Sequence, residues 1–105
     1  MCTATWIRDE EGYQLFFNRD EKFTRRRATA PSVRVTDGIR FVAPSDGDFG
    51  GTWIAVNEFG VSVCLLNGAA LTGFSQAMIG RTSRGILIPE IIAGRSVDAI
   101  CRRLL

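Results

Sequence analysis

Residues 2–18, which read CTATWIRDEEGYQLFFN, decide the fold. β-Branched and aromatic residues are frequent in residues 2–8 and again in residues 13–18, and such residues favour strands. Between them, Asp9-Glu10-Glu11-Gly12 has the polar and glycine composition of a turn. The stretch therefore predicts a β-hairpin that starts at the first residues of the chain.

Further short strand-like segments follow the hairpin at residues 33–35, 39–42, 52–56 and 61–66. Residues 21–32 are polar and basic and contain a proline, so we expect an exposed connection there. The tetrad Asn57-Glu58-Phe59-Gly60 predicts a tight turn. The segments on either side of this turn carry apolar residues on both faces, which is typical of a sheet covered on two sides.

The C-terminal third changes to a helical period. Apolar residues recur at the i, i+3, i+4 and i+7 spacing of one helix face, namely Val97, Ile100, Cys101 and Leu104. Ser96 is a suitable N-cap for this helix. An earlier helix is predicted over residues 89–93, with Gly94 ending it. Strands followed by helices predict an α+β fold, in which the C-terminal helices pack on one face of an antiparallel β-sheet.

The composition indicates a globular chain. Of 105 residues, 46% are apolar and 23% are charged, which is consistent with a single domain over residues 1–105. A net charge of only +2 gives no reason to expect a nucleic acid partner, and the run Arg25-Arg26-Arg27 is expected to be a solvated loop. No apolar stretch is long enough to span a membrane and no secretory signal is evident, so we expect a cytoplasmic protein.

The chain contains no histidine. This excludes Ser-His and Cys-His dyads, the two-histidine iron site and most catalytic zinc sites. Cys2, Cys64 and Cys101 are too widely spaced to indicate a disulfide framework or a metal site, so no cofactor is expected, and the latter two are predicted to be small buried residues. A proton shuttle near neutral pH would then need another group, and a free α-amine titrates in that range.

Cys2 directly follows the initiator methionine, and its side chain is small enough for Met1 to be removed. It would then carry a thiol and a free α-amine on the same carbon. The thiol could attack an acyl carbon while the amine accepts and returns the proton. The alternative is an incidental small residue at a frayed end.

The motif Asn18-Arg19-Asp20-Glu21 ends the second strand of the predicted hairpin. If residues 9–12 form the turn, the hairpin brings this motif back against Cys2. A guanidinium nearby would favour the thiolate, and a carboxylate could hold the amine or the arginine in place. The alternative is a charged strand end with surface ion pairs that contribute little.

Five features of the chain occur together: Met1-Cys2-Thr3, Asn18-Arg19-Asp20-Glu21, Gly50-Gly51-Thr52-Trp53, Asn67 and Ser83-Arg84-Gly85. In this order, and over most of the chain, they resemble the NRDE family, also called the transport and Golgi organisation 2 family. The resemblance implies an N-terminal-nucleophile (Ntn) hydrolase-like fold with four αββα layers. More distantly, the chain is similar to choloylglycine hydrolases and penicillin V acylases, which begin with the same cysteine.

On that pattern Cys2 would be the nucleophile, Arg19 and Asp20 would support its thiol and amine, and Asn67 would offer an amide donor to an oxyanion. The resemblance assigns supporting places to Asn18, Glu21, Gly50, Gly51 and Thr52. Gly50 and Gly51 are better explained as turn glycines that shape a loop and are required by backbone geometry. The tryptophan that follows them is expected to anchor the core.

Family members are about twice this length, so the chain is expected to supply half of an αββα sandwich. One face of its sheet would be exposed, or covered by a second copy in a homodimer. The resemblance implies a hydrolase of amide (C–N) bonds that acts on a small-molecule amide or acyl substrate. The alternative is a non-catalytic binding or trafficking module that handles lipid or haem. Without histidine, haem could be ligated only by cysteine, methionine or tyrosine.

Overall fold

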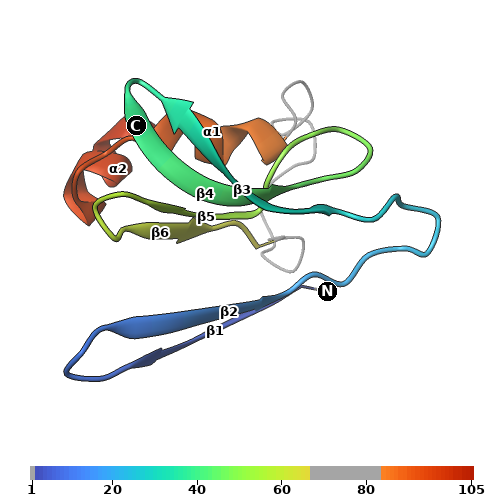
Figure 1. The fold of residues 1–105 in the computed structure, drawn as a ribbon, viewed down its shortest axis with the longest axis horizontal. Coiled ribbons are helices and arrows are strands. Elements are labelled where there is room, and N and C mark those ends of the chain that lie inside the picture. The colour runs from blue at the N-terminus through green and yellow to red at the C-terminus, as the bar shows by residue number, and fades with distance from the viewer. Residues whose placement is uncertain (1, 67–83) are drawn as a thin grey trace.

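The computed structural model describes residues 2–66 and 84–105 and shows an α+β fold, as predicted (Figure 1). Its elements in chain order are β1 (Thr3–Arg8), β2 (Tyr13–Asn18), β3 (Thr29–Thr36), β4 (Ile39–Ser45), β5 (Ile54–Asn57), β6 (Ser62–Cys64), the short 3-10 helix η1 (Arg84–Ile86), α1 (Leu87–Ile91) and α2 (Val97–Leu104). Strands β1 and β2 form one antiparallel sheet. The second antiparallel sheet has the order β3-β4-β5-β6.

The predicted hairpin is confirmed. β1 and β2 pair in register from Thr3 opposite Asn18 to Arg8 opposite Tyr13. At the turn, the Asp9 carboxylate accepts hydrogen bonds from the backbone N–H groups of the residues two and three positions later, at 2.8 and 3.0 Å. This local bonding fixes the turn and therefore the register of the whole hairpin.

The four-stranded sheet lies between the helices and the hairpin. Figure 1 shows α1 and α2 on one face of this sheet, with the β1–β2 hairpin below the other face. The core joins the helices to the sheet and comprises Phe41, Ala43, Ala55, Ile88, Ile91, Ile92 and Ile100. Burial of these apolar side chains is the main force that holds the helices on the sheet.

The opposite face of the four-stranded sheet is also apolar. Residues paired directly across antiparallel strands point to the same face. Val33 pairs with Val42, and Val42 pairs with Val56, so these side chains share the face turned toward the hairpin. Val33 remains 66% exposed, so the hairpin covers this face only in part.

The predicted turn at residues 57–60 is held by a buried asparagine. The Asn57 side-chain amide donates to the carbonyls of Ile92 and Gly94, both at 2.8 Å. Its oxygen accepts from the backbone N–H groups of Phe59 and Val61, both at 3.0 Å. Asn57 thus joins the β5–β6 turn to the end of α1.

Three details differ from the sequence-based predictions. The expectation of a connection through residue 32 is wrong, because β3 begins at Thr29, and Pro31 is tolerated there since β3 is an edge strand of the described sheet. The first helix begins at Leu87, two residues before its predicted start. Ser96 caps α2 as predicted, but Cys101 on this helix is exposed, so the expectation of its burial is wrong.

Within residues 2–66 and 84–105, no helix has the length and apolar character needed to cross a membrane.

Candidate functional site

Cys2 and Arg19 lie at the open end of the hairpin, just beyond the pair formed by Thr3 and Asn18. Side chains alternate between the two faces of a strand. Cys2 and Arg19 therefore share a face with the pair Ala4 and Phe17, if the register continues. This is the face that turns toward the four-stranded sheet, since Leu15 on the same face of β2 lines a cavity against that sheet.

The guanidinium of Arg19 is held on three sides. It forms an ion pair with Asp46, and its Nε donates to Glu21 at 3.2 Å. Its Cζ atom lies 4.2 Å from the centroid of the Trp53 ring, which is a cation–π contact. The side chains of Arg19 and Asp46 are only 15% and 10% exposed, so solvent screens this pair far less than a surface ion pair.

Asp46 occupies the loop between β4 and β5. Its Oδ1 accepts hydrogen bonds from the backbone N–H groups of Asp48 and Phe49, at 2.8 and 3.0 Å. Burial alone would raise the pKa of the Asp46 carboxyl. The N–H groups of Phe49 and Asp48 and the charges of Arg25 and Arg19 outweigh it, so the pKa lies below its ordinary value. Asp46 is therefore an ionised, oriented carboxylate.

A second arginine completes an ion-pair cluster, which we define as Arg19, Glu21, Arg25, Asp46 and Asp48. Arg25 lies 3.1 Å from Asp46, 3.5 Å from Asp48 and 3.7 Å from Glu21. With two cations and three carboxylates, the cluster carries a formal charge of −1. Much of the positive field of Arg19 is thus balanced locally, so its effect on a neighbouring group depends on close and directed contact.

Asp20, the third residue of the Asn18-Arg19-Asp20-Glu21 motif, is exposed. The pKa of its carboxyl lies below the ordinary value, because the terminal α-ammonium group donates a hydrogen bond to it and attracts its charge.

The Gly50-Gly51-Thr52 segment connects the Asp46 loop to the helical side of the molecule. A Cβ atom at Gly51 would lie 2.6 Å from the Cα of Gly85, so the two backbones touch. The N–H of Thr52 donates to the carbonyl of Gly85 at 3.0 Å, and Thr52 is buried. Gly50 has a φ of +71°, a conformation that glycine adopts without strain. These contacts are structural and set the position of the Asp46 loop.

The structure brings part of the predicted site together. Arg19 and Glu21 meet in the ion-pair cluster, with Gly50 and Gly51 in the loop that supplies Asp46. Asn18 is exposed and pairs with Thr3 across the hairpin. Asn67 lies outside the described residues, as does Ser83 of the later family feature.

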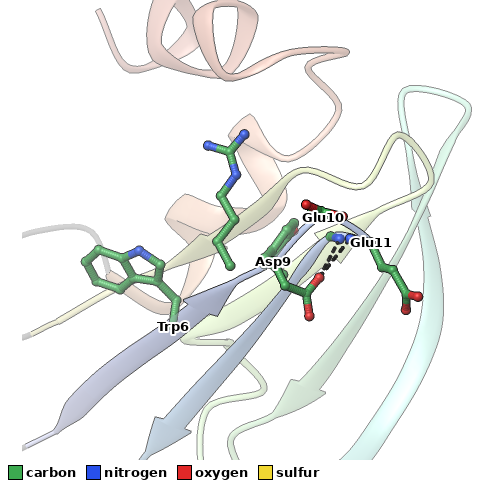
Figure 2. Close-up of a pocket in the computed structure, with 7 residues that line it drawn as sticks. Trp6, Asp9, Glu10 and Glu11 are labelled. Atoms are coloured by element: carbon green, nitrogen blue, oxygen red, sulfur yellow. Dashed lines mark hydrogen bonds between the residues drawn. The ribbon is translucent and has the colours of Figure 1, made fainter.

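Among the residues that the structure describes, two cavities border the hairpin. One of about 480 Å³ lies between β2 and the four-stranded sheet, and its lining comprises Tyr13, Leu15, Pro31, Val42, Pro44, Ile54, Ala55, Val56, Gly60 and Ser62. The other, of about 500 Å³, surrounds the hairpin turn, where Figure 2 shows Trp6 and the acidic residues Asp9, Glu10 and Glu11. A six-residue strand spans about 20 Å, so the turn cavity lies at the opposite end of the hairpin from Cys2.

All three cysteines are free. Burial raises the pKa of the Cys64 thiol, which makes its thiolate less available than that of an exposed cysteine. In the part of the chain that the structure describes, no group of three or more cysteine, aspartate or glutamate side chains is arranged to hold a metal ion.

Sequence reasoning missed Asp46 and Trp53 as partners of Arg19. The expectation that Trp53 anchors the core is only partly met, because the residue is half-buried and its ring faces the guanidinium. The run Asp46-Gly47-Asp48 carried a usable signal, because an aspartate in a glycine-rich turn commonly binds backbone N–H groups ahead of it. That signal locates a rigid carboxylate, although it does not identify the arginine that the carboxylate meets.

Comparison of the chain with known proteins identifies its family. No curated protein and no solved structure matches the chain. A family model described as Transport and Golgi organisation 2 matches residues 1–104. The resemblance seen in Cys2, in the Asn18–Glu21 motif and in the Gly-Gly-Thr-Trp run is thus confirmed, and the chain belongs to the Transport and Golgi organisation 2 family.

Proposed function

We propose that the chain is an N-terminal-cysteine hydrolase of amide (C–N) bonds, with Cys2 as nucleophile after removal of Met1. The observation that carries the proposal is the β1–β2 register. The printed pairs end at Thr3 opposite Asn18, which Cys2 and Arg19 directly follow, so continuation of this register would bring the two side by side on the face turned toward the second sheet. A thiol with its own α-amine needs no histidine, and the chain has none.

In the proposed reaction the Cys2 sulfur attacks the amide carbon while the α-amine takes the thiol proton. The C–N bond breaks, the amine returns that proton to the leaving nitrogen, and a thioester remains on sulfur. Water then attacks the thioester, giving the free acid and the restored thiol. The N-terminal amine is thus base in the first half and acid when the leaving group departs.

Arg19 and Asp20 have separate supporting roles in this proposal. The guanidinium of Arg19 stabilises negative charge on the Cys2 sulfur. Asp20 orients the α-amine, and its lowered pKa supports this role, because the terminal ammonium group is the main cause. Removal of Met1 would make the backbone nitrogen of Cys2, the adjacent residue, the new terminal α-amine. Asn67 is proposed as the oxyanion donor on the family resemblance alone, since it lies outside the described residues.

The other parts of the proposal rest on the family and on general features of the chain. Residues 1–105 are proposed to form one domain that acts in the cytoplasm. Its substrate is proposed to be a small-molecule amide or acyl compound. A second copy of the chain is proposed to cover the exposed valines of β3. These are Val33 and Val35, which are 66% and 64% exposed.

The test begins with the mass of the protein made in cells. We expect the mass of a chain without Met1; a retained Met1 would contradict the proposal, because the amine would then belong to the wrong residue. The processed protein is next incubated with a panel of N-acyl p-nitroanilides. We expect release of p-nitroaniline and a thioester adduct on the N-terminal peptide, both lost in Cys2→Ala.

Cys64→Ala is the matched control, because it removes another thiol of the chain and leaves the N-terminus intact. It should retain both the release and the adduct. Equal release by the wild type and by Cys2→Ala would assign the hydrolysis to a contaminant or to another site.

The alternative function is a non-catalytic binding or trafficking module. The cavity between β2 and the four-stranded sheet favours it, because about 480 Å³ of largely apolar lining could hold part of an apolar ligand. Saturable binding of a fatty acid by both the wild type and Cys2→Ala, without turnover of any amide, would support this alternative. Haem binding is tested separately by an absorbance titration with haem. The absence of a saturable shift would exclude haem as the ligand.

A further inference from the structure

The residue that fixes Arg19 is Asp46, to which the sequence motifs assign no role. We propose that Asp46 is a positioning residue: together with the ring of Trp53, it holds the guanidinium of Arg19 beside the terminal cysteine. This inference rests on the proposed function, because the group that it ultimately serves is the Cys2 thiol.

The Asp46 carboxylate is oriented by its own loop. Its Oδ1 is occupied by the N–H groups of Asp48 and Phe49, and the Asp46 N–H donates to the Gly51 carbonyl at 2.7 Å. These bonds leave Oδ2 directed at the arginines, where Arg19 and Arg25 bind it. The carboxylate is therefore preorganised before any substrate arrives, which is the usual requirement for accurate placement of a charged group.

The guanidinium of Arg19 has little freedom once it is bound. Asp46 binds its NH2 group, Glu21 accepts from its Nε, and the Trp53 ring lies 4.2 Å away against its plane. An arginine side chain free to sample many rotamers would spend little time beside the thiol. Asp46 and Trp53 restrict it to one arrangement.

The cluster also tethers the open end of the hairpin to the second sheet. At the turn end, the Tyr13 hydroxyl donates to the Gly60 carbonyl at 2.7 Å. Between these two attachments lies the cavity of about 480 Å³, so the hairpin stands partly clear of the sheet. The Arg19–Asp46 pair is the attachment at the end of the hairpin where Cys2 lies. It fixes the end of β2, which Arg19 directly follows.

Removing the charge of Asp46 distinguishes two possible effects of this residue, which change the alkylation rate of Cys2 in opposite directions. As a simple negative charge, Asp46 would oppose ionisation of the Cys2 thiol, and its removal would speed alkylation. As the positioning partner it keeps the guanidinium in place, and its removal would slow alkylation. The second effect should dominate, because Cys2 and Arg19 both adjoin the last pair of the hairpin, Thr3 with Asn18, whereas Asp46 belongs to a loop of the other sheet.

The experiment uses full-length protein shown by mass to lack Met1. Alkylation of Cys2 by iodoacetamide is followed across pH by mass spectrometry of the N-terminal peptide. In Asp46→Asn we expect the rate at neutral pH to fall about tenfold, and the deficit to vanish at alkaline pH, where the thiol is ionised without help. Asp48→Asn is the matched control, since it makes the same isosteric change in the same loop and does not contact Arg19. Its rate should equal that of the wild type.

The inference is overturned if Asp46→Asn reacts as fast as the wild type or faster. It is also overturned if Arg19→Ala and Asp46→Asn slow the reaction independently, because two residues that act through one contact should not be additive. Circular dichroism reports whether Asp46→Asn folds. If it does not, Trp53→Phe takes its place, with a smaller decrease expected, and an unchanged rate in Trp53→Phe overturns the inference.

The same data distinguish this inference from the proposed function. Cys101 is exposed and serves as an internal reference thiol. If wild-type Cys2 reacts no faster than Cys101, both proposals fail. If Cys2 reacts faster and Asp46→Asn leaves its rate unchanged, only the role of Asp46 is lost.

Discussion

Replacing Gly51 by alanine should displace the loop that carries Asp46. The new Cβ would lie 2.6 Å from the Gly85 Cα and 2.9 Å from its carbonyl carbon, and both are backbone atoms that cannot rotate away. Relieving such an overlap costs about 1–3 kcal/mol. The shift would also break the hydrogen bond from Thr52 N–H to the Gly85 carbonyl, worth about 1–3 kcal/mol where the donor stays buried. The expected loss of unfolding free energy is thus about 2–6 kcal/mol.

Gly50→Ala is the matched control, because it adds the same methyl group one residue earlier. Nothing lies within 4 Å of its Cβ, so the cost arises only from the φ of +71° and should be about 1 kcal/mol. Urea unfolding followed by far-UV circular dichroism gives both free energies, and iodoacetamide alkylation reports Cys2. Equal stability of the two variants would refute the reasoning, because the contact with Gly85 would then contribute nothing.

Asn57→Ala should lower the unfolding free energy by about 3 kcal/mol, because it leaves the buried Gly94 carbonyl and three further backbone groups without partners. A loss below about 1 kcal/mol in a urea titration would contradict this. Asp46 has a lowered pKa in the folded state, so its contribution to stability is present above the ordinary value of 3.8 and is lost as pH falls through the folded pKa. Unfolding measured from pH 6 down to pH 2 should therefore depend less on pH in Asp46→Asn, and parallel curves would refute that assignment. Alkylation of Cys64 should be slower than that of exposed Cys101 in the folded protein, because burial raises the pKa of the Cys64 thiol. In urea the two cysteines should react at the same rate. Equal rates in the folded state would show that Cys64 is not protected.

Elements set by local interactions were predictable from the sequence. The hairpin follows from strand-forming residues on either side of a turn whose bonds close within four residues. The second helix follows from its cap, with Ser96 accepting from the N–H of Ala99. The start of β3 was not predictable, because Thr29 joins the strand only by pairing with Ser45, across an irregularity in the register. That pairing depends on β4, which lies later in the chain.

The same division applies to the site. Cys2 and Arg19 adjoin the pair Thr3–Asn18 at the open end of one hairpin, so their placement at this end could be predicted from the turn position alone. Asp46 lies 27 residues after Arg19 and reaches it only because the two sheets face each other. The sequence shows that Asp46 lies in a turn rich in glycine and acidic residues. It does not show which arginine side chain contacts that turn.

The burial of the Arg19–Asp46 pair argues for a role beyond stability. With side chains that are 15% and 10% exposed, this pair is more buried than the surface ion pairs that contribute almost nothing. Burial does not make the pair a strong source of stability either, because desolvation of both charges offsets most of their attraction, and apolar replacements are often tolerated as well or better. A pair that costs desolvation is most useful where one orientation of a charge matters. In this chain that place is the open end of the hairpin, next to the cysteine for which we propose the chemistry.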